Sequence, residues 1–205
     1  MEREQIKTKD RVRDLGEVYT NKREVNAMLD LVGDITYKMS TKILEPTCGN
    51  GNFLDAILER KLVHVENTYK KHGGIKRFEY NIIKSLASTY GVDIDLDNVI
   101  ESRQRLLQRV KNFYSNILNT NIANEGFYKS VNYILEKNII LGDTLNGQEY
   151  IVFSEFKKVS SDNYALAEKQ YPYLELLKPN KEQIPCAVYE EKNYLNLHEN
   201  GVFNE

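Results

Sequence analysis

Cysteine and long apolar runs are both scarce in this sequence. Its 205 residues include two cysteines, Cys48 and Cys186, which are too few for a disulfide framework or a cysteine-based metal site. We therefore expect two reduced thiols and no bound metal. No apolar run approaches the ~20 residues of a membrane-spanning helix, and the N-terminal segment lacks the apolar centre of a signal peptide. These absences predict a cytoplasmic protein without membrane contact.

An excess of positive charge is also absent. The 28 Lys and Arg residues are balanced by 30 Asp and Glu residues, which gives a formal net charge of −2. Because neutralising phosphates supplies the sequence-independent part of nucleic-acid affinity, this balance excludes a strongly basic nucleic-acid binder. Any contact with DNA has to be local and weak. The N-terminal arm mixes basic and acidic residues, as a solvated surface segment does.

The composition, 41% hydrophobic and 28% charged, is that of a folded domain with a real core. Apolar residues at helical spacing predict a helix over residues 23–33. Short apolar runs, most of them ending at an acidic residue, predict strands at residues 43–45, 88–94, 139–142 and 150–153. Strands that alternate with helices favour an α/β fold with an open parallel sheet flanked by helices, whose ligand site lies at the carboxyl edge.

Two stretches interrupt this pattern. Residues 61–78 are polar and basic and contain Gly73 and Gly74, which predicts an inserted loop or short helix at the surface. Beyond Phe156 the pattern decays into short mixed segments that hold three of the four prolines. We therefore divide the chain into an N-terminal arm and helix (1–40), a core (41–156) and a C-terminal extension (157–205).

The segment ILEPTCGNGNF, from Ile43 to Phe53, is the most informative part of the chain. It runs from a strand through an acidic residue and a glycine turn into a helix. Gly49 and Gly51 permit a tight turn and the close approach of a ligand to the backbone, and a helix N-terminus favours negative charge. This order of features predicts a pocket for a small ligand that carries a carboxylate or phosphate.

Three further segments complete a recognisable set: GEVYTNKREVNAML from Gly16, GVDID from Gly91 and LGDTL from Leu141. Together with EPTCGNGNF they resemble, in content and order, the motifs of the S-adenosylmethionine (SAM)-dependent DNA methyltransferases of the adenine-N6 type. The resemblance covers about two thirds of the chain, and the glycine motif matches [DE]-P-x-x-G-x-G-x-F at every defined position. It implies a Rossmann-like class I SAM-dependent methyltransferase fold, here truncated.

The resemblance implies a role for each matched position. Thr20 would contact the methionine carboxylate of SAM and Glu45 its amino group. Asp93 would accept hydrogen bonds from both ribose hydroxyls, as a carboxylate can. Ile94 would pack on the adenine, and Asp143 would accept from the adenine amine. The full expected SAM site is Tyr19, Thr20, Glu45, Pro46, Thr47, Gly49, Gly51, Phe53, Asp93, Ile94, Asp143, Thr144 and Leu145.

Each of these residues also has an ordinary structural interpretation. Asp93 or Asp143, taken alone, is more often the cap of a strand end or a surface carboxylate. Thr20 is typical of a helix start. Cys48 is a small side chain in a turn, and we assign it no chemistry.

The catalytic motif of the family, [DNS]-P-P-[YFW], does not occur in the chain. In that family it follows the fourth strand, where its side chain and carbonyl accept protons from the adenine amine and its aromatic ring stacks on the flipped base. The corresponding position here holds Ser154, Glu155 and Phe156, which are weak catalytic candidates. Residues 170–173, QYPY, resemble the motif only weakly.

The sequence thus supports two main hypotheses. One is an adenine-N6 DNA methyltransferase, related to phage or restriction-modification enzymes, that needs a partner or a diverged motif for methyl transfer. The other is an inactive SAM-binding module for regulation or interaction; a methyltransferase for RNA or protein is a third. Because the fourth strand would form a sheet edge that needs covering, we also expect a homo-oligomer or a partner subunit.

Overall fold

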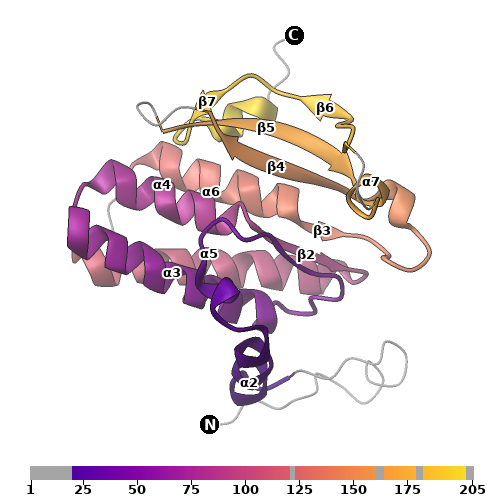
Figure 1. Ribbon diagram of the computed structural model, residues 1–205, viewed down its shortest axis with the longest axis horizontal. Helices are drawn as coiled ribbons and strands as arrows, with labels where there is room; N and C mark the ends of the chain where they lie inside the picture. Colours follow the sequence, from indigo (N-terminus) through magenta and orange to yellow (C-terminus); the bar gives the residue numbers. More distant parts are fainter. Residues whose placement is uncertain (1–19, 121–122, 160–163, 179–181, 202–205) are drawn as a thin grey trace.

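The computed structural model describes residues 20–120, 123–159, 164–178 and 182–201, and it confirms the α/β class (Figure 1). Three parallel strands form one sheet in the order β1-β2-β3, and a separate antiparallel sheet lies on the far side of the molecule from helix α2. The parallel strands are β1 (Ile43–Glu45), β2 (Thr89–Asp93) and β3 (Ile139–Leu141). The main helices are α2 (Lys22–Val32), α3 (Asn52–His72), α4 (Ile75–Leu86), α5 (Leu96–Leu118) and α6 (Glu125–Asn138).

The two crossovers of the parallel sheet place their helices on one face. The chain steps from β1 to β2 and from β2 to β3 in the same direction, so right-handed connections bring α3 and α5 to the same side. Gly91 of β2 faces this layer, where an added Cβ atom would lie 2.7 Å from Leu54 of α3. The opposite face of the sheet, with Tyr90 and Val92, packs on Ile151 and Phe153 instead.

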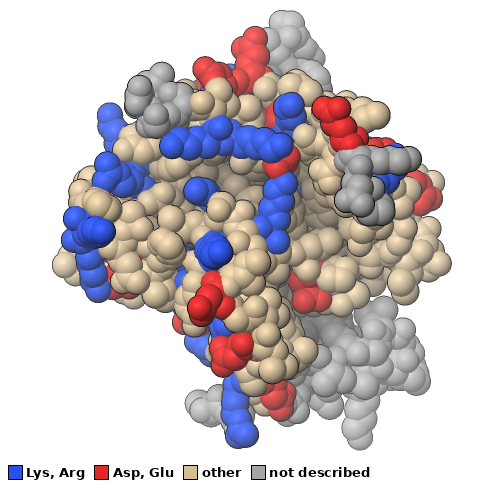
Figure 2. Space-filling model, viewed as in Figure 1, with Lys and Arg blue, Asp and Glu red and all other residues tan. Residues whose placement is uncertain are grey.

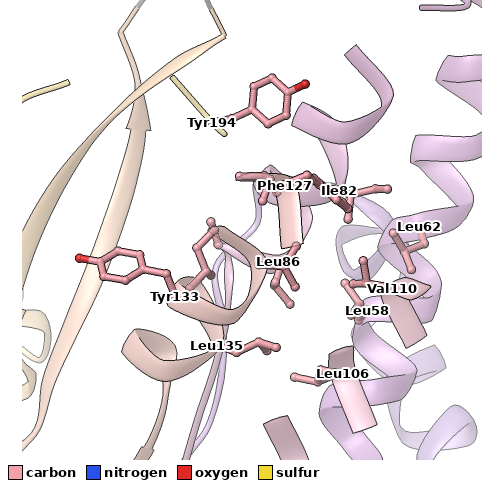
Figure 3. Close-up of a cluster of buried hydrophobic side chains, with 14 of the residues drawn as sticks. Leu58, Leu62, Ile82, Leu86, Leu106, Val110, Phe127, Tyr133, Leu135 and Tyr194 are labelled. Atoms are coloured by element: carbon pink, nitrogen blue, oxygen red, sulfur yellow. The ribbon is translucent and has the colours of Figure 1, made fainter. Parts of the chain in front are cut away.

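The main hydrophobic core lies within the helical layer. Figure 3 shows leucines of α3 and α5 meeting residues of α4 and α6. Phe78 anchors an aromatic cluster in this core, with its ring 4.9 Å from Tyr69 and 5.6 Å from Phe113. Tyr194, from near the C-terminal end of the described chain, is also fully buried here and donates a hydrogen bond of 2.6 Å to Glu79. The C-terminal residues are therefore part of the core packing.

The expected surface loop at residues 61–78 is wrong, because helix α3 continues through it to His72. Gly73 and Gly74, both with positive φ, separate α3 from α4. The polar composition of this segment predicted a surface position, but Lys61 is buried rather than solvated. Its ammonium donates hydrogen bonds to the Thr41 carbonyl (2.8 Å) and to the Ser88 hydroxyl (2.6 Å).

This buried amine gives a testable pH dependence. Burial lowers the pKa of Lys61 to about 7, whereas an unfolded lysine keeps a pKa of about 10.4. Between these values the unfolded chain holds the proton more tightly, so the free energy of unfolding rises with pH, by at most about 1.4 kcal/mol per unit. Lys61→Met removes this contribution. Urea denaturation from about pH 7 to about pH 10 should show stability rising in the wild type relative to Lys61→Met; parallel pH curves would contradict it.

The antiparallel sheet consists of β4 (Val152–Lys158), β5 (Ala165–Pro172), β6 (Ala187–Val188) and β7 (Lys192–Asn193). Strand β5 pairs along the whole of β4, and both β6 and β7 pair with β5. Glu168 of β5 is completely buried and accepts hydrogen bonds from Ser154 (2.6 Å) and from Tyr133 of α6 (2.8 Å). The bond from Tyr133 links the sheet to the helical layer, and the bond from Ser154 joins β4 to β5.

Two further expectations about this region are wrong. The fourth strand does not join the parallel sheet, and residues beyond 156 include the longest described strand rather than only short mixed segments. The chain between β3 and β4, residues 142–151, is too short for a crossover that would bring β4 back parallel, since such a connection needs a dozen or more residues. The predicted boundary at 156/157 falls inside β4. Among the described residues, no helix combines the length and the apolarity that crossing a membrane requires.

Candidate functional site

A cavity of about 450 Å³, here called the strand-end cavity, opens at the carboxyl ends of the three parallel strands. Its wall comes from the turns that follow β1, β2 and β3 and from Thr20, which precedes Asn21, the N-cap of α2. The lining residues are 20, 45–50, 52, 53, 93–95, 98 and 142–145. Four sequence segments that are far apart in the chain therefore meet at one site.

The glycine turn after β1 is held from behind by helix α5. Gly49 and Gly51 have φ angles of 53° and 85°, which favour glycine. A Cβ atom on Gly51 would lie 2.8 Å from Oγ of Ser102, and that hydroxyl donates a hydrogen bond of 2.8 Å to the Gly49 carbonyl. Arg105 donates a further bond of 2.8 Å to the Asn50 carbonyl. The backbone of the turn is thus fixed before any ligand arrives.

Asp93, at the end of β2, connects the turns of two strands. One carboxylate oxygen accepts a hydrogen bond of 2.8 Å from the Gly49 amide. The other accepts bonds from the Asp95 amide (2.9 Å) and the Asn98 side chain (3.3 Å). A carboxylate has about four acceptor positions, so Asp93 can still accept from a ligand hydroxyl.

Asp143 follows β3 and organises its own turn. Its carboxylate accepts hydrogen bonds from the amides of Asn146 (3.0 Å) and Leu145 (2.8 Å). These hydrogen bonds lower the pKa of Asp143, and the bond from the Asn146 amide has the largest effect. Asp143 is therefore an ionised acceptor at neutral pH. Thr144 donates a bond of 3.2 Å to the Pro46 carbonyl, which ties this turn to the turn after β1.

The remaining wall combines a carboxylate with apolar side chains. Glu45 is half-buried and lies 3.5 Å from the Thr47 hydroxyl, and burial raises the pKa of its carboxyl group. Ile94 and Leu145 are 62% and 83% exposed. Both line the cavity, so a ligand with an apolar face would cover them.

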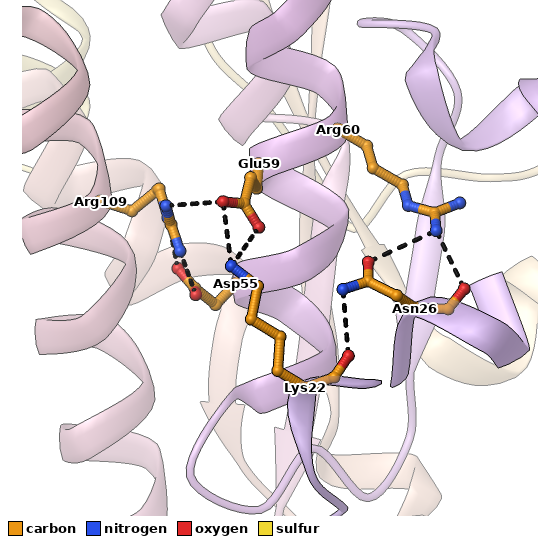
Figure 4. Close-up of polar contacts among 6 residues, drawn as sticks. All are labelled: Lys22, Asn26, Asp55, Glu59, Arg60 and Arg109. Carbon is orange, nitrogen blue, oxygen red and sulfur yellow. Dashed lines mark hydrogen bonds and ion pairs between the residues drawn. The ribbon is translucent and has the colours of Figure 1, made fainter. Parts of the chain in front are cut away.

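Helix α2 is fixed beside the cavity by polar contacts with α3 (Figure 4). Lys22 forms an ion pair with Glu59 (3.0 Å), and Arg60 forms one with Asp30 (2.6 Å). Arg109 of α5 binds Asp55 of the same α3 surface at 2.6 Å. The Asn52 side chain also donates a bond of 3.3 Å to the carbonyl of Thr20, which places Thr20 at the cavity wall.

The cavity brings together every described residue of the expected SAM site except Gly51. Gly51 is buried beneath the turn, and Tyr19 lies outside the described residues. Sequence reasoning missed the lining residues Cys48, Asn50, Asn52, Asp95, Asn98 and Gly142. All but Asn98 lie next to predicted positions within the motif segments, which was the available signal; Asn98 lies on α5, three residues beyond the GVDID segment.

The weak catalytic candidates do not line this cavity. Ser154 is buried and donates its hydroxyl hydrogen to Glu168 (2.6 Å). Glu155 forms ion pairs with Lys42 and Lys157, and Phe156 packs with its ring 6.4 Å from Tyr133. Ser154 and Glu155 instead line a second cavity of about 260 Å³ between the two sheets. These residues lie away from the strand-end cavity because β4 is not part of the parallel sheet.

Cys48 is expected to resist alkylation in the folded protein. Burial and, to a smaller extent, the nearby Asp93 raise the pKa of its thiol to about 12, so the reactive thiolate is almost absent near pH 8. Cys186 is exposed. Iodoacetamide should therefore modify Cys186 alone in the folded protein and both cysteines after unfolding, as peptide mass mapping would show. Equal labelling of the two thiols in the folded state would contradict this environment for Cys48.

No protein-family model matches this chain, and no curated protein or solved structure shows significant similarity to it. The described residues contain no group of three or more His, Cys, Asp or Glu side chains that could hold a metal ion.

Proposed function

We propose that the strand-end cavity binds SAM and that the chain is a SAM-binding protein of the adenine-N6 DNA methyltransferase type, with a shortened Rossmann-like fold. One observation carries the proposal. The four motif segments, spread over residues 16–145 of the sequence, line a single cavity at the carboxyl edge of the parallel sheet. That edge is where ligands bind in open α/β sheets.

The chemistry of the wall suits the three parts of SAM. Asp93 keeps an acceptor position for a ribose hydroxyl, and Asp143 is an ionised acceptor for an adenine amine. Ile94 and Leu145 provide exposed apolar surface for a planar ring. Glu45 offers a carboxylate to the methionine amino group, and the glycine turn with Thr20 offers polar groups to its carboxylate. The volume is in the range of small-molecule sites, about 300–1,000 Å³.

Methyl transfer to adenine would require acceptor groups from outside the described chain. The expected proline motif is absent, and Ser154, Glu155 and Phe156 lie away from the cavity. Within the described residues β1 pairs with β2 alone, so its outer edge is open to another strand. These observations support an active site completed by a partner subunit or a second copy. They equally favour the alternative of a SAM-binding module without transfer activity.

Two measurements on the purified full chain separate these possibilities. Calorimetry should show that SAM and S-adenosylhomocysteine bind at one site, whereas ATP and NAD do not compete. Binding of ATP or NAD with no binding of SAM would refute the proposed cofactor. Incubation with methyl-labelled SAM and unmethylated DNA then decides activity. Label on DNA would show a complete enzyme, and SAM binding without transfer would favour the partner-dependent or inactive form.

A further inference from the structure

A third cavity of about 210 Å³, here called the lysine cavity, lies at the other end of the parallel strands. It is next to the residues that precede β1 and β2, whereas the strand-end cavity lies beyond their last residues. Four lysines from three different segments line it: Lys42, Lys84, Lys157 and Lys158. In Figure 2, basic side chains gather where the antiparallel sheet adjoins the helices, which is the junction these lysines line.

The charges around the lysine cavity are not balanced. Glu155 is the one carboxylate among the lining residues, and it pairs with Lys42 and with Lys157, the latter at 3.2 Å. Among the described residues no ion pair is formed by Lys84 or Lys158. Four positive charges therefore face one negative charge. Such a cavity attracts an anion with more than one negative charge.

One lining residue, Tyr80, carries a buried hydroxyl group that supports the same conclusion. Tyr80 lines the cavity and is only 5% exposed, and its hydroxyl is buried without a hydrogen-bond partner among the described residues. A buried polar group without a partner is destabilising and calls for an explanation. Ser40 adds a further hydroxyl group to the lining, whereas the Ser88 hydroxyl already donates to the Met39 carbonyl. An oxyanion would supply acceptors both for the lysines and for hydroxyl donors.

We propose that the lysine cavity binds a phosphate group, either free or as part of a nucleic-acid strand. Lys84 and Lys158 supply the positive charge that no described carboxylate neutralises, and Lys42 and Lys157 line the cavity beside them. The Tyr80 hydroxyl donates to a phosphate oxygen. Lysine ammonium groups bind phosphate as point charges, which suits a cavity lined by separate lysines rather than by a planar arginine fork. This site stands independently of SAM binding in the strand-end cavity.

The experiment titrates inorganic phosphate and a short single-stranded DNA oligonucleotide into the full chain by calorimetry at low salt. The test variant combines Lys84→Gln with Lys158→Gln, and the control combines Lys71→Gln with Lys76→Gln, which removes the same charge from exposed positions that do not line the cavity. We expect at least a tenfold loss of phosphate affinity in the test variant alone. The proposal would be overturned if both variants lost the same affinity, or if the wild-type protein bound neither phosphate nor the oligonucleotide.

The two sources of phosphate give different results. Competition between inorganic phosphate and the oligonucleotide, with both weakened in the test variant, identifies the nucleic-acid backbone as a ligand. Phosphate binding that the oligonucleotide does not displace identifies a free phosphate site.

Tyr80→Phe tests the hydroxyl without disturbing the ring packing. We expect it to be at least as stable as the wild type without phosphate and to gain less thermal stability when phosphate is added. An equal gain in both proteins would remove Tyr80 from the site.

Discussion

Replacement of Asp93 by alanine is expected to reduce the affinity for SAM by about 100-fold or more. In the proposed complex this carboxylate accepts from a ribose hydroxyl, and a hydrogen bond to a charged group contributes about 1.5–3 kcal/mol. The same carboxylate also holds the Gly49 amide at 2.8 Å, so its loss loosens the turn that faces the cofactor. Both effects act in the same direction on binding.

The matched control for Asp93→Ala is Asp97→Ala. Asp97 is an exposed carboxylate four residues further along the chain and does not line the cavity. Calorimetric titration of SAM should show wild-type affinity for Asp97→Ala, and thermal denaturation should show that both variants are folded. Asp93→Asn, which keeps one oxygen acceptor for the Gly49 amide, should fall between the wild type and Asp93→Ala. A folded Asp93→Ala protein with wild-type affinity would mean that the cofactor binds elsewhere.

Gly51→Ala is expected to lower the free energy of unfolding by about 2–4 kcal/mol. The position has a φ of 85°, where a Cβ atom costs roughly 1–2 kcal/mol. The new methyl group would also lie 2.8 Å from Oγ and 3.1 Å from Cα of Ser102, so the turn and α5 have to move apart. Urea denaturation measures the loss, and SAM affinity should fall with it because the same turn faces the cavity.

A double-mutant cycle with Ser102→Gly separates the steric contact from the backbone strain. Removing the Ser102 side chain relieves the contact with its Oγ and Cβ atoms but leaves the positive φ of residue 51 unchanged. The double variant should therefore be less destabilised than the sum of the two single variants, by an amount that reports the contact. Strict additivity would show that Ser102 does not constrain the turn.

The parallel strands and the cavity were predictable because their signals are local. Each of the first three strands is a short apolar run whose last residues include or precede a carboxylate, and the turns contain glycine. Parallel pairing then places all of these turns at one edge of the sheet. The three strands and the first helix are confirmed, and the structure brings Glu45, Asp93 and Asp143 to one cavity. The identity of the ligand stays a prediction.

The errors arose where a long-range contact decides the structure. Lys61 looks like a surface residue, but four carbonyl and hydroxyl oxygens around β1 and β2 accept hydrogen bonds from its amine, which lets α3 bury it. The fourth strand was assigned to the parallel sheet, although its partner is β5, which lies in the segment interpreted as irregular. Composition alone does not reveal such partners, because they are set by tertiary packing rather than by local preference.

We propose that SAM occupies the cavity at the carboxyl ends of the parallel strands. The most direct test is to add SAM to isotope-labelled protein and follow the backbone amide signals by NMR. We predict that the largest shifts fall on Gly49, on residues 93–95 and on residues 143–145, with little change in β5 or β6. The claim would be contradicted by an unchanged spectrum at saturating SAM, or by shifts confined to the antiparallel sheet.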